Sequence, residues 1–415
     1  MSSRKVILMI VGLILLLVWR FTYFYQHQPH YRDGQEIKLQ VVLYETPIAS
    51  NQGQRFAVKT EDNKRISIRS NLKELYHYGD KLAITGKLQV RNNSKGTEFY
   101  SLNFPKIRVV NESGNPIFEA SRWIRLKSTV LFEGSLPPIS ANLLLGIVFG
   151  AKGDFPPVFW SDLRNAGVLH IIAASGMNVS FFTGAVMFSL NMFLKRRLSL
   201  ILAVFAAIFY SFLVGFEASI LRATIMAIIA FTASFFGRQN FAVLALIATG
   251  FVMLLWSPAF LFDVGFQLSF LATLGILLLK PLFGAIYKFP FVGEDLVTTV
   301  SAQLATTPIL LGTFGSIGLW SLLVNILVLW TVPILMLLGS MAVILGLVFA
   351  PLGKLLLFLC LPFLLLFEKV VTFFGGFSWS LAVDVFPWQF SIGYYLILVA
   401  AVILKRQKQV QDSKL

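Results

Sequence analysis

The chain has 415 residues, of which 56% are hydrophobic and only 13% are charged, and its mean hydropathy is +0.75. Soluble domains carry about 25% charged residues, so this composition excludes an ordinary soluble protein and predicts a membrane protein. Its 35 Lys and Arg residues outnumber its 20 Asp and Glu residues, an excess that suits cytoplasmic loops, an anionic membrane surface or a nucleic acid.

The N-terminal segment predicts a membrane anchor over residues 1–25. Arg4 and Lys5 precede an apolar run from residue 6 to residue 18, which continues through aromatic residues to Phe24. No small-x-small cleavage pattern follows this run. We therefore expect an uncleaved anchor.

Residues 35–112 differ from the rest of the chain and predict a small β-domain. Short β-type runs such as KLQVVLY, RISIRS and LAITGKLQV alternate with turn clusters, and charged residues are frequent. Such runs fit a small barrel, and the OB-fold is the commonest five-stranded candidate. The basic stretch 117–135 follows, and its apolar residues Trp123 and Val130 can share one helical face, which predicts an amphipathic helix on the membrane surface.

Long apolar segments dominate residues 140–405. A helix needs roughly 20 apolar residues to cross the hydrocarbon core, so with the anchor we predict a polytopic α-helical membrane protein of about ten spans. Two of the segments exceed one crossing, and each can contain a break or a re-entrant turn. The predicted spans are 163–190, 198–216, 219–236, 240–256, 265–287, 295–319, 322–349, 355–375 and 391–404.

The basic residues of the short loops predict the orientation. They fall on one side of the membrane, whereas the loops on the other side, near 217, 258–263, 316–320 and 377–389, contain no Lys or Arg. The positive-inside rule then places both termini, including the basic tail 406–415, in the cytoplasm and the β-domain outside a cytoplasmic (inner) membrane. The basic residues in question are Arg4, Lys5, Lys195, Arg196, Arg197, Arg238, Lys288, Lys354, Lys405 and Arg406.

Polar side chains inside the predicted spans are the first candidates for function, because such groups are costly in lipid and usually face a bundle interior or water. In GVLHIIAASGMNVSFF, His170 precedes the small residues Ser175 and Gly176 and the amide Asn178. Small residues allow a helix break or a tight helix contact, and one interhelical hydrogen bond is an equally good explanation of His170.

Three further segments carry polar candidates. Arg222 lies near the outer end of its span, where it either snorkels to the interface, with Glu217 as a partner, or lines the path of an anionic substrate. Asp263 and Gln267 are four residues apart and share a helical face, although Asp263 also suits a helix N-cap. Gln303 and Asn325 form polar spots that suit either helix packing or a polar path.

Enzyme and metal signatures are absent from the sequence. It contains no Gly-Lys-Ser/Thr phosphate loop and no His-Glu-x-x-His motif, and Cys360 is its single cysteine. We therefore predict no catalytic residue, no metal site and no cofactor.

Five segments in order, LLLGIVFGAKGDF, GVLHIIAASGMNV, LRATIM, FDVGFQLSFLATLGIL and SAQLATTPILLGTFGSIGLWSLLVNILVLWTVP, resemble the successive blocks of the ComEC family of competence DNA-uptake channels. The similarity runs from about Leu143 to the end of the membrane region, and GFQLSF is its most specific part. The resemblance implies a nonenzymatic channel that carries single-stranded DNA into the cytoplasm during natural transformation, with an OB-like domain presenting the DNA outside.

The channel hypothesis gives a role to the polar residues named above. Those of the implied channel path are His170, Ser175, Gly176, Asn178, Arg222, Asp263, Gln267, Gln303 and Asn325. In the β-domain, basic residues near aromatic ones suit a single strand, although a solvated surface explains them as simply. These β-domain candidates are Lys59, Lys64, Arg65, Arg69, Tyr76 and Tyr78.

The implied partners are the lipid bilayer, a periplasmic or surface DNA receptor and a cytoplasmic helicase, and the oligomeric state is open. Two departures from the family matter. Asn178 stands where the family usually has a second histidine, and the β-lactamase-like metallohydrolase domain does not follow the membrane region, which implies a separate nuclease. The competing hypothesis is a membrane-embedded enzyme or transporter for lipid or cell-envelope substrates, with His170 and Asp263 as its acid–base pair.

Overall fold

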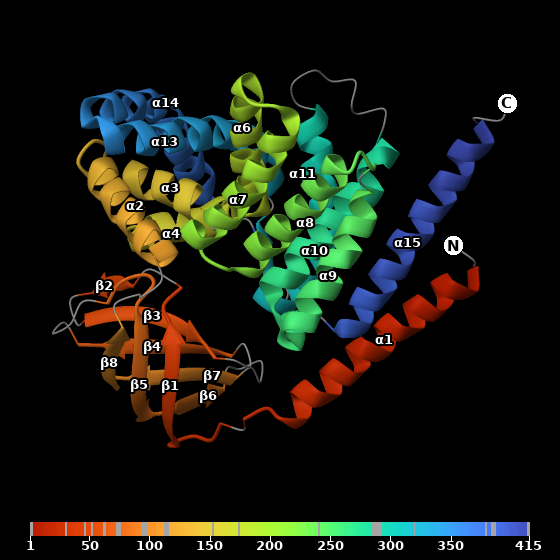
Figure 1. Ribbon diagram of the computed structural model, residues 1–415, viewed down its shortest axis with the longest axis horizontal. Helices are drawn as coiled ribbons and strands as arrows, with labels where there is room; N and C mark the ends of the chain where they lie inside the picture. The colour runs from red at the N-terminus through yellow and green to blue at the C-terminus, as the bar shows by residue number, and fades with distance from the viewer. Residues whose placement is uncertain are drawn as a thin grey trace. The chain divides into compact units, whose positions relative to one another are not determined.

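The computed structural model divides the chain into two units (Figure 1). The first unit contains residues 1–126 and 247–263, and the second contains residues 127–246 and 264–415. The structure describes residues 3–29, 31–44, 47–50, 53–60, 64–71, 76–92, 98–111, 116–151, 153–172, 175–239, 241–283, 293–318, 320–377, 380–382 and 387–412.

The first unit begins with the predicted anchor, helix α1 (Ser3–Gln26). Its apolar side chains are exposed around the helix, and Leu8 for example is 71% exposed, as expected of a helix that faces lipid. The Arg20 guanidinium donates to the carbonyls of Leu255 at 2.9 Å and Trp256 at 3.0 Å. These carbonyls end helix α9 (Ala242–Trp256), so Arg20 satisfies acceptors that a helix C-terminus leaves open.

The β-domain of this unit contains two sheets. One has the order β1-β5-β8 and is antiparallel throughout, whereas the other has the order β2-β3-β4-β7-β6 and pairs β4 with β7 in parallel. The strands are β1 (Glu36–Val42), β2 (Ile48–Ser50), β3 (Gly53–Lys59), β4 (Arg65–Ser70), β5 (Lys81–Lys87), β6 (Gln89–Asn92), β7 (Glu98–Asn103) and β8 (Lys106–Asn111).

Alternation along the strands builds the core of the β-domain. In β4, Ile66 and Ile68 are fully buried while Arg65 and Arg69 point outward, the period of two that a half-buried strand requires. Inward side chains from both sheets join one hydrophobic cluster, which includes Leu82 and Leu102. The predicted small β-domain is confirmed, with β2 and β7 missed from the sequence, and the OB-fold assignment stays a prediction.

Helix α2 (Pro116–Glu133) docks its first half on the β-domain. Nη1 of Arg122 lies 3.2 Å from Oδ1 of Asp80, and the Arg125 guanidinium lies over the Tyr78 ring at 4.3 Å. Burial raises the pKa of Tyr78 to about 12, and the charge of Arg125 opposes this rise. The structure turns Arg122 and Arg125 toward the β-domain and leaves Trp123 52% exposed, and the placement of this amphipathic helix on the membrane surface stays a prediction.

The second unit is a bundle of helices. Helices α6, α7 and α8 pack on one another, α8 packs on α10, α10 on α11, and α13 pairs with α14 against α3. The helices are α3 (Pro138–Phe149), α4 (Pro157–Asn165), α5 (Leu169–Ile172), α6 (Gly176–Phe193), α7 (Arg196–Val214), α8 (Ala218–Phe235), α10 (Val264–Leu279), α11 (Gly293–Phe314), α12 (Ser321–Val328), α13 (Thr331–Val348), α14 (Ala350–Gly375) and α15 (Trp388–Asp412).

Short elements complete the two units. Two 3-10 helices, η1 (Pro258–Phe262) and η2 (Lys280–Phe283), follow α9 and α10. In the second unit, β9 (Ser316–Gly318) pairs antiparallel with β10 (Ser380–Ala382), and this pairing joins the link after α11 to the link after α14.

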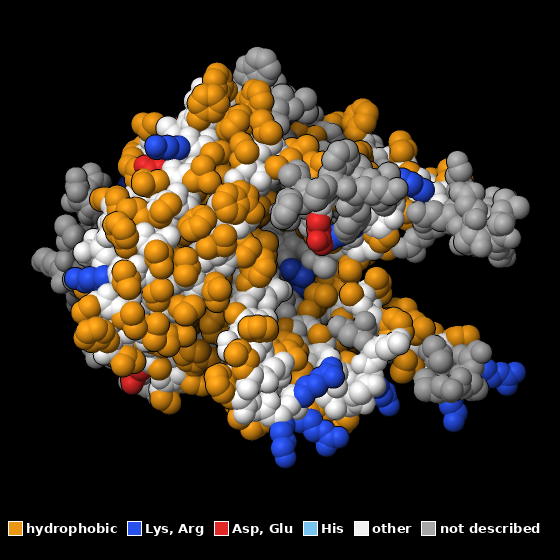
Figure 2. All heavy atoms as spheres, turned by 90° about the horizontal axis from the view of Figure 1, so that it is seen from above, with side chains coloured by type: hydrophobic (Ala, Val, Ile, Leu, Met, Phe, Trp, Pro, Cys, Tyr) orange, Lys and Arg blue, Asp and Glu red, His pale blue; other side chains and the backbone are white. Residues whose placement is uncertain are grey.

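The described residues contain eight helices that are long and apolar enough to cross a membrane. The polytopic helical architecture is therefore confirmed, and hydrophobic side chains dominate the face drawn in Figure 2. Two of the predicted spans are not among the eight, because 163–190 is divided among α4, α5 and α6 and because α9, within 240–256, has only 15 residues. The predicted break in 322–349 is present between α12 and α13.

A glycine contact holds α13 against α14. A Cβ on Gly353 would lie 2.6 Å from the Cα of Gly346 and 2.9 Å from the Ala342 carbonyl oxygen. Both neighbours are backbone atoms that cannot rotate away, so this crossing depends on small residues.

We expect Gly353→Val to separate α13 from α14 and to destabilise the protein by about 1–3 kcal/mol, the usual cost of overpacking. The measurement is thermal unfolding of the full-length protein in detergent. Gly393→Val on α15 is the matched control, because nothing lies within 4 Å of a Cβ at that position. Equal melting temperatures for the two variants would show that the crossing is not tight.

Candidate functional site

The helix break predicted near Ser175 is present in the second unit. After α5 ends at Ile172, Ser175 is extended, with φ −110° and ψ 159°, and α6 starts at Gly176. A second break precedes α5 at Gly167, whose φ of +72° favours glycine. Breaks free backbone amides and carbonyls, which membrane proteins tolerate only where protein or water satisfies them.

The Gly167 break lies against the start of α12. A Cβ on Gly167 would lie 2.5 Å from the Cβ of Ser321, so the two backbones touch. His170, three residues later on α5, is exposed and has the Gly167 backbone as a hydrogen-bond partner. His170 is therefore tied to the backbone at this break.

The Gly176 break brings α6 onto α8. A Cβ on Gly176 would overlap the Arg222 guanidinium and would lie 3.2 Å from the Cβ of Ala223. The absence of a side chain at Gly176 therefore makes the room that the arginine occupies, and the N-terminus of α6 lies beside a cation.

Arg222 makes two side-chain contacts. Its Nε donates to Oγ of Ser269 on α10 at 2.7 Å, and its Nη1 donates to Sδ of Met226 at 3.3 Å. Glu217, the partner suggested from the sequence, is not among these contacts. Across the part of the chain that the structure describes, no carboxylate forms an ion pair with Arg222.

Asn178 and Ser175 hold α6 in place. Oγ of Ser175 donates to Oδ1 of Asn178 at 3.1 Å, and Nδ2 of Asn178 donates to the Ile147 carbonyl of α3 at 2.8 Å. Asn178 is only 1% exposed. Both ends of the Asn178 amide are therefore used in packing α6. The ComEC resemblance leads us to expect a histidine at this position.

The remaining amides of the predicted path lie on α10, α11 and α12. Nε2 of Gln303 donates to Oγ of Ser321 at 2.5 Å, which joins α11 to α12. Asn325, one turn after Ser321, is buried, and its Oδ1 has no partner among the described residues. Gln267 is half-buried on α10.

Asp263 belongs to the first unit and His170 to the second. Oδ2 of Asp263 lies 3.5 Å from Nζ of Lys59 on β3. Asp263 follows η1 in an extended conformation, with φ −75° and ψ 120°. Its described charge partner is therefore a β-domain lysine.

The outward face of β3 and β4 is basic. In the sheet register Arg55 lies opposite Arg69, and Lys59 lies opposite Arg65. Like charges directly opposite each other destabilise a sheet. On the same outward face, the exposed Arg91 of β6 lies opposite Phe99 of β7, which is 55% exposed. We call Arg55, Lys59, Arg65, Arg69, Arg91 and Phe99 the basic sheet face.

The predicted aromatic partners lie elsewhere. Tyr76 is 5% exposed and Tyr78 is 4% exposed, so neither ring can stack on a base at the surface, which argues against the role predicted for them. Lys64 lies over the rings of Tyr31 at 4.9 Å and Tyr100 at 5.4 Å. The sequence analysis missed Phe99 as a candidate for base stacking. Side chains alternate along its strand, so that Tyr100 points inward and Phe99 points outward, and this alternation could have identified Phe99.

The sequence matches the family described as Competence protein over residues 147–408, which is more than half of the chain. The chain belongs to the competence protein family. The matched region contains both helix breaks and the residues Arg222, Ser269, Gln303 and Asn325. The polar contacts described above therefore lie within the part of the chain that defines the family.

Two curated relatives of the competence protein show how much is shared. ComE operon protein 3 of Bacillus subtilis (strain 168) is 27% identical over 203 residues, which cover 48% of this chain and 26% of that protein. An uncharacterized protein of Aquifex aeolicus (strain VF5) is 32% identical over 136 residues, 32% of each chain. The matches thus span about a quarter and a third of the relatives. No solved structure matches the chain significantly.

We expect Arg55→Thr to leave the β-domain as stable as before or more stable by about 0.2–1 kcal/mol, because it removes the repulsion with Arg69. Thermal unfolding of the full-length protein at low salt measures this, since salt screens the effect. Lys87→Thr is the control: Lys87 lies opposite Glu36, so its loss should destabilise. Destabilisation by Arg55→Thr would show that Arg55 is structural.

Proposed function

We propose that this competence protein is a nonenzymatic channel that carries single-stranded DNA across the membrane during natural transformation. Family membership supports a role in DNA uptake. The observation that carries the channel proposal is Arg222, a cation inside a membrane bundle whose described contacts are a hydroxyl and a thioether.

Electrostatics gives this observation its weight. A buried cation is expensive unless an anion compensates its charge, and ionisable residues in membrane helices usually mark a substrate path. Gly176 places the first turn of α6, with its partial positive charge, next to Arg222. Both groups favour an anion, and the phosphates of a passing strand supply one.

The other proposed path residues are neutral. Three groups offer hydrogen bonds to DNA but carry no fixed positive charge that would hold it. They are His170, the Gln303–Ser321 pair and Asn325. Such a lining lets a polyanion leave as easily as it enters, which conduction requires. Gln267 completes this set, whereas Ser175 and Asn178 keep the break in shape.

The basic sheet face is proposed as the first contact with DNA. A cationic surface with an exposed ring fits a single strand, because phosphates follow the charges and a base stacks on the aromatic face. The opposition of Arg55 and Arg69 supports this use, since a purely structural sheet gains nothing from it. Asp263 would then compete with DNA for Lys59.

The surroundings of the channel are proposals too. Loop charges favour an inner-membrane protein with both termini in the cytoplasm and the β-domain outside. The proposed partners in transport are a periplasmic or surface DNA receptor and a cytoplasmic helicase. The enzyme hypothesis gains no support from Asp263, which pairs with Lys59.

We expect Arg222→Gln to lower uptake of labelled DNA by about tenfold to a hundredfold, the cost of one charged hydrogen bond to phosphate. The measurement compares internalised with surface-bound DNA in transformable cells at matched protein level. Lys354→Gln, which removes an exposed charge near the start of α14, is the control. Normal uptake by Arg222→Gln would remove Arg222 from the path.

We expect Gly176→Val to reduce uptake as well, because a side chain there displaces the Arg222 guanidinium. Gly184→Val on the same helix is the matched control, since nothing lies within 4 Å of a Cβ at that position. Uptake should fall only in the first variant. An equal effect of both would mean that α6 tolerates no branched residue, whatever its place.

We expect Arg69→Gln and Arg91→Gln each to lower the slope of log affinity against log salt by about 0.7 for single-stranded DNA bound by the full-length protein. Phe99→Ala should weaken binding without changing that slope, because it removes stacking and no charge. Lys87→Gln, on the other sheet, should change neither. A loss for Lys87→Gln equal to that for Arg69→Gln would place the DNA elsewhere on the domain.

A further inference from the structure

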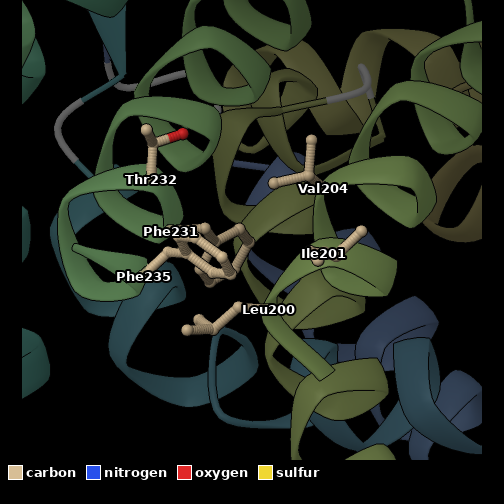
Figure 3. Close-up of a pocket in the computed structure, with 6 residues that line it drawn as sticks. All are labelled: Leu200, Ile201, Val204, Phe231, Thr232 and Phe235. Carbon is tan, nitrogen blue, oxygen red and sulfur yellow. The ribbon is translucent and has the colours of Figure 1, made fainter. Parts of the chain in front are cut away.

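A groove lies between α7 and α8, on a different part of the bundle from the polar contacts described above (Figure 3). Its volume is about 180 Å³, well below the roughly 300–1,000 Å³ of sites for compact small molecules. Figure 3 shows the side chains of both helices that line it. The lining residues are Leu200, Ile201, Val204, Phe231, Thr232 and Phe235, of which only Thr232 is polar.

Cations stand at one end of this groove. Lys195, Arg196 and Arg197 are exposed at the start of α7. Residues four apart share a helical face, so Arg196 lies above Leu200 and Arg197 above Ile201. The basic residues and the apolar lining thus continue along one side of α7.

The end of α8 adds a fourth cation. Its last turn closes with Gly237 at φ +66° and a hydrogen bond from the Arg238 amide to the Ala233 carbonyl at 2.9 Å, a Schellman-type ending. Arg238 is exposed directly after this turn, just beyond Phe235. Because α7 starts where the neighbouring antiparallel α8 ends, all four cations lie at the same end of the helix pair.

No acidic side chain balances this cluster locally. The segments 194–214 and 218–241 contain no Asp or Glu, and none of the ion pairs among the described residues involves the four cations. Two of the cations also face the partial positive charge of the α7 N-terminus, which disfavours them further. A negatively charged ligand would relieve both repulsions.

We propose that the α7–α8 groove binds an anionic phospholipid, with an acyl chain against Val204 and Phe231 and the phosphate among Lys195, Arg196, Arg197 and Arg238. Charge complementarity selects this occupant over a neutral lipid, because basic pockets between membrane helices recognise acidic headgroups. The narrow apolar groove selects a lipid over a free anion. The site is separate from the proposed DNA path.

The test measures lipid retained by the full-length protein after purification from vesicles of equal phosphatidylglycerol and phosphatidylcholine. We expect wild type to retain phosphatidylglycerol preferentially and the double variant Arg196→Gln, Arg197→Gln to lose about thirtyfold in relative affinity. Lys354→Gln, which removes an exposed charge near the start of α14, should behave as wild type. Equal retention of both lipids by wild type would overturn the proposal.

A second pair of variants tests the groove itself. Val204→Trp fills it and should release the bound lipid, whereas Phe205→Trp, at an exposed neighbouring position of α7, should not. A competition experiment adds millimolar inorganic phosphate to wild type and to Val204→Trp. If phosphate displaced bound lipid equally from both proteins, the basic residues alone would hold the lipid and the groove would have no part in binding. Because lipid retention is the readout, these outcomes leave the channel proposal untouched.

Discussion

The hydrocarbon core of a membrane supplies no hydrogen bonds, so every polar group of the second unit must find its partner within the protein. Many hydroxyls donate to a carbonyl one turn back in their own helix, and other groups find a partner on a neighbouring helix. Tyr210 Oη donates to the Val148 carbonyl at 2.9 Å, and the hydroxyls of Ser211 and Thr224 lie 2.6 Å apart. Arg222 differs from these groups. A hydroxyl and a thioether accept its hydrogen bonds, but neither neutralises its positive charge.

Much of the membrane architecture could be predicted from the sequence, since apolar length and loop charge are local properties. The breaks near Ser175 and between α12 and α13 followed from small residues and from segments too long for one crossing. Partners could not be predicted in the same way. Ser269 and Ser321 are ordinary helix serines until folding brings them to Arg222 and Gln303.

The β-domain shows the same limit. The β-type runs predicted the strands, but only the register reveals that Arg55 meets Arg69 across β3 and β4. Tyr76 and Tyr78 stand near basic residues in the sequence, which suggested stacking, yet the Tyr76 ring is part of the hydrophobic core and the Tyr78 ring is buried under Arg125. Burial in a short irregular segment depends on the tertiary fold. Such a segment has no hydrophobic period from which its burial could be predicted.

The pairing of β9 with β10 has a consequence for biosynthesis. Strand β9 lies between α11 and α12, but its partner β10 is made only after α12, α13 and α14 have left the ribosome. The backbone groups of β9 must therefore wait in water or in the insertion machinery until β10 arrives, which makes this clasp a late event in assembly. Until it closes, the ends of α11 and α14 are tied only by the packing of the helices themselves.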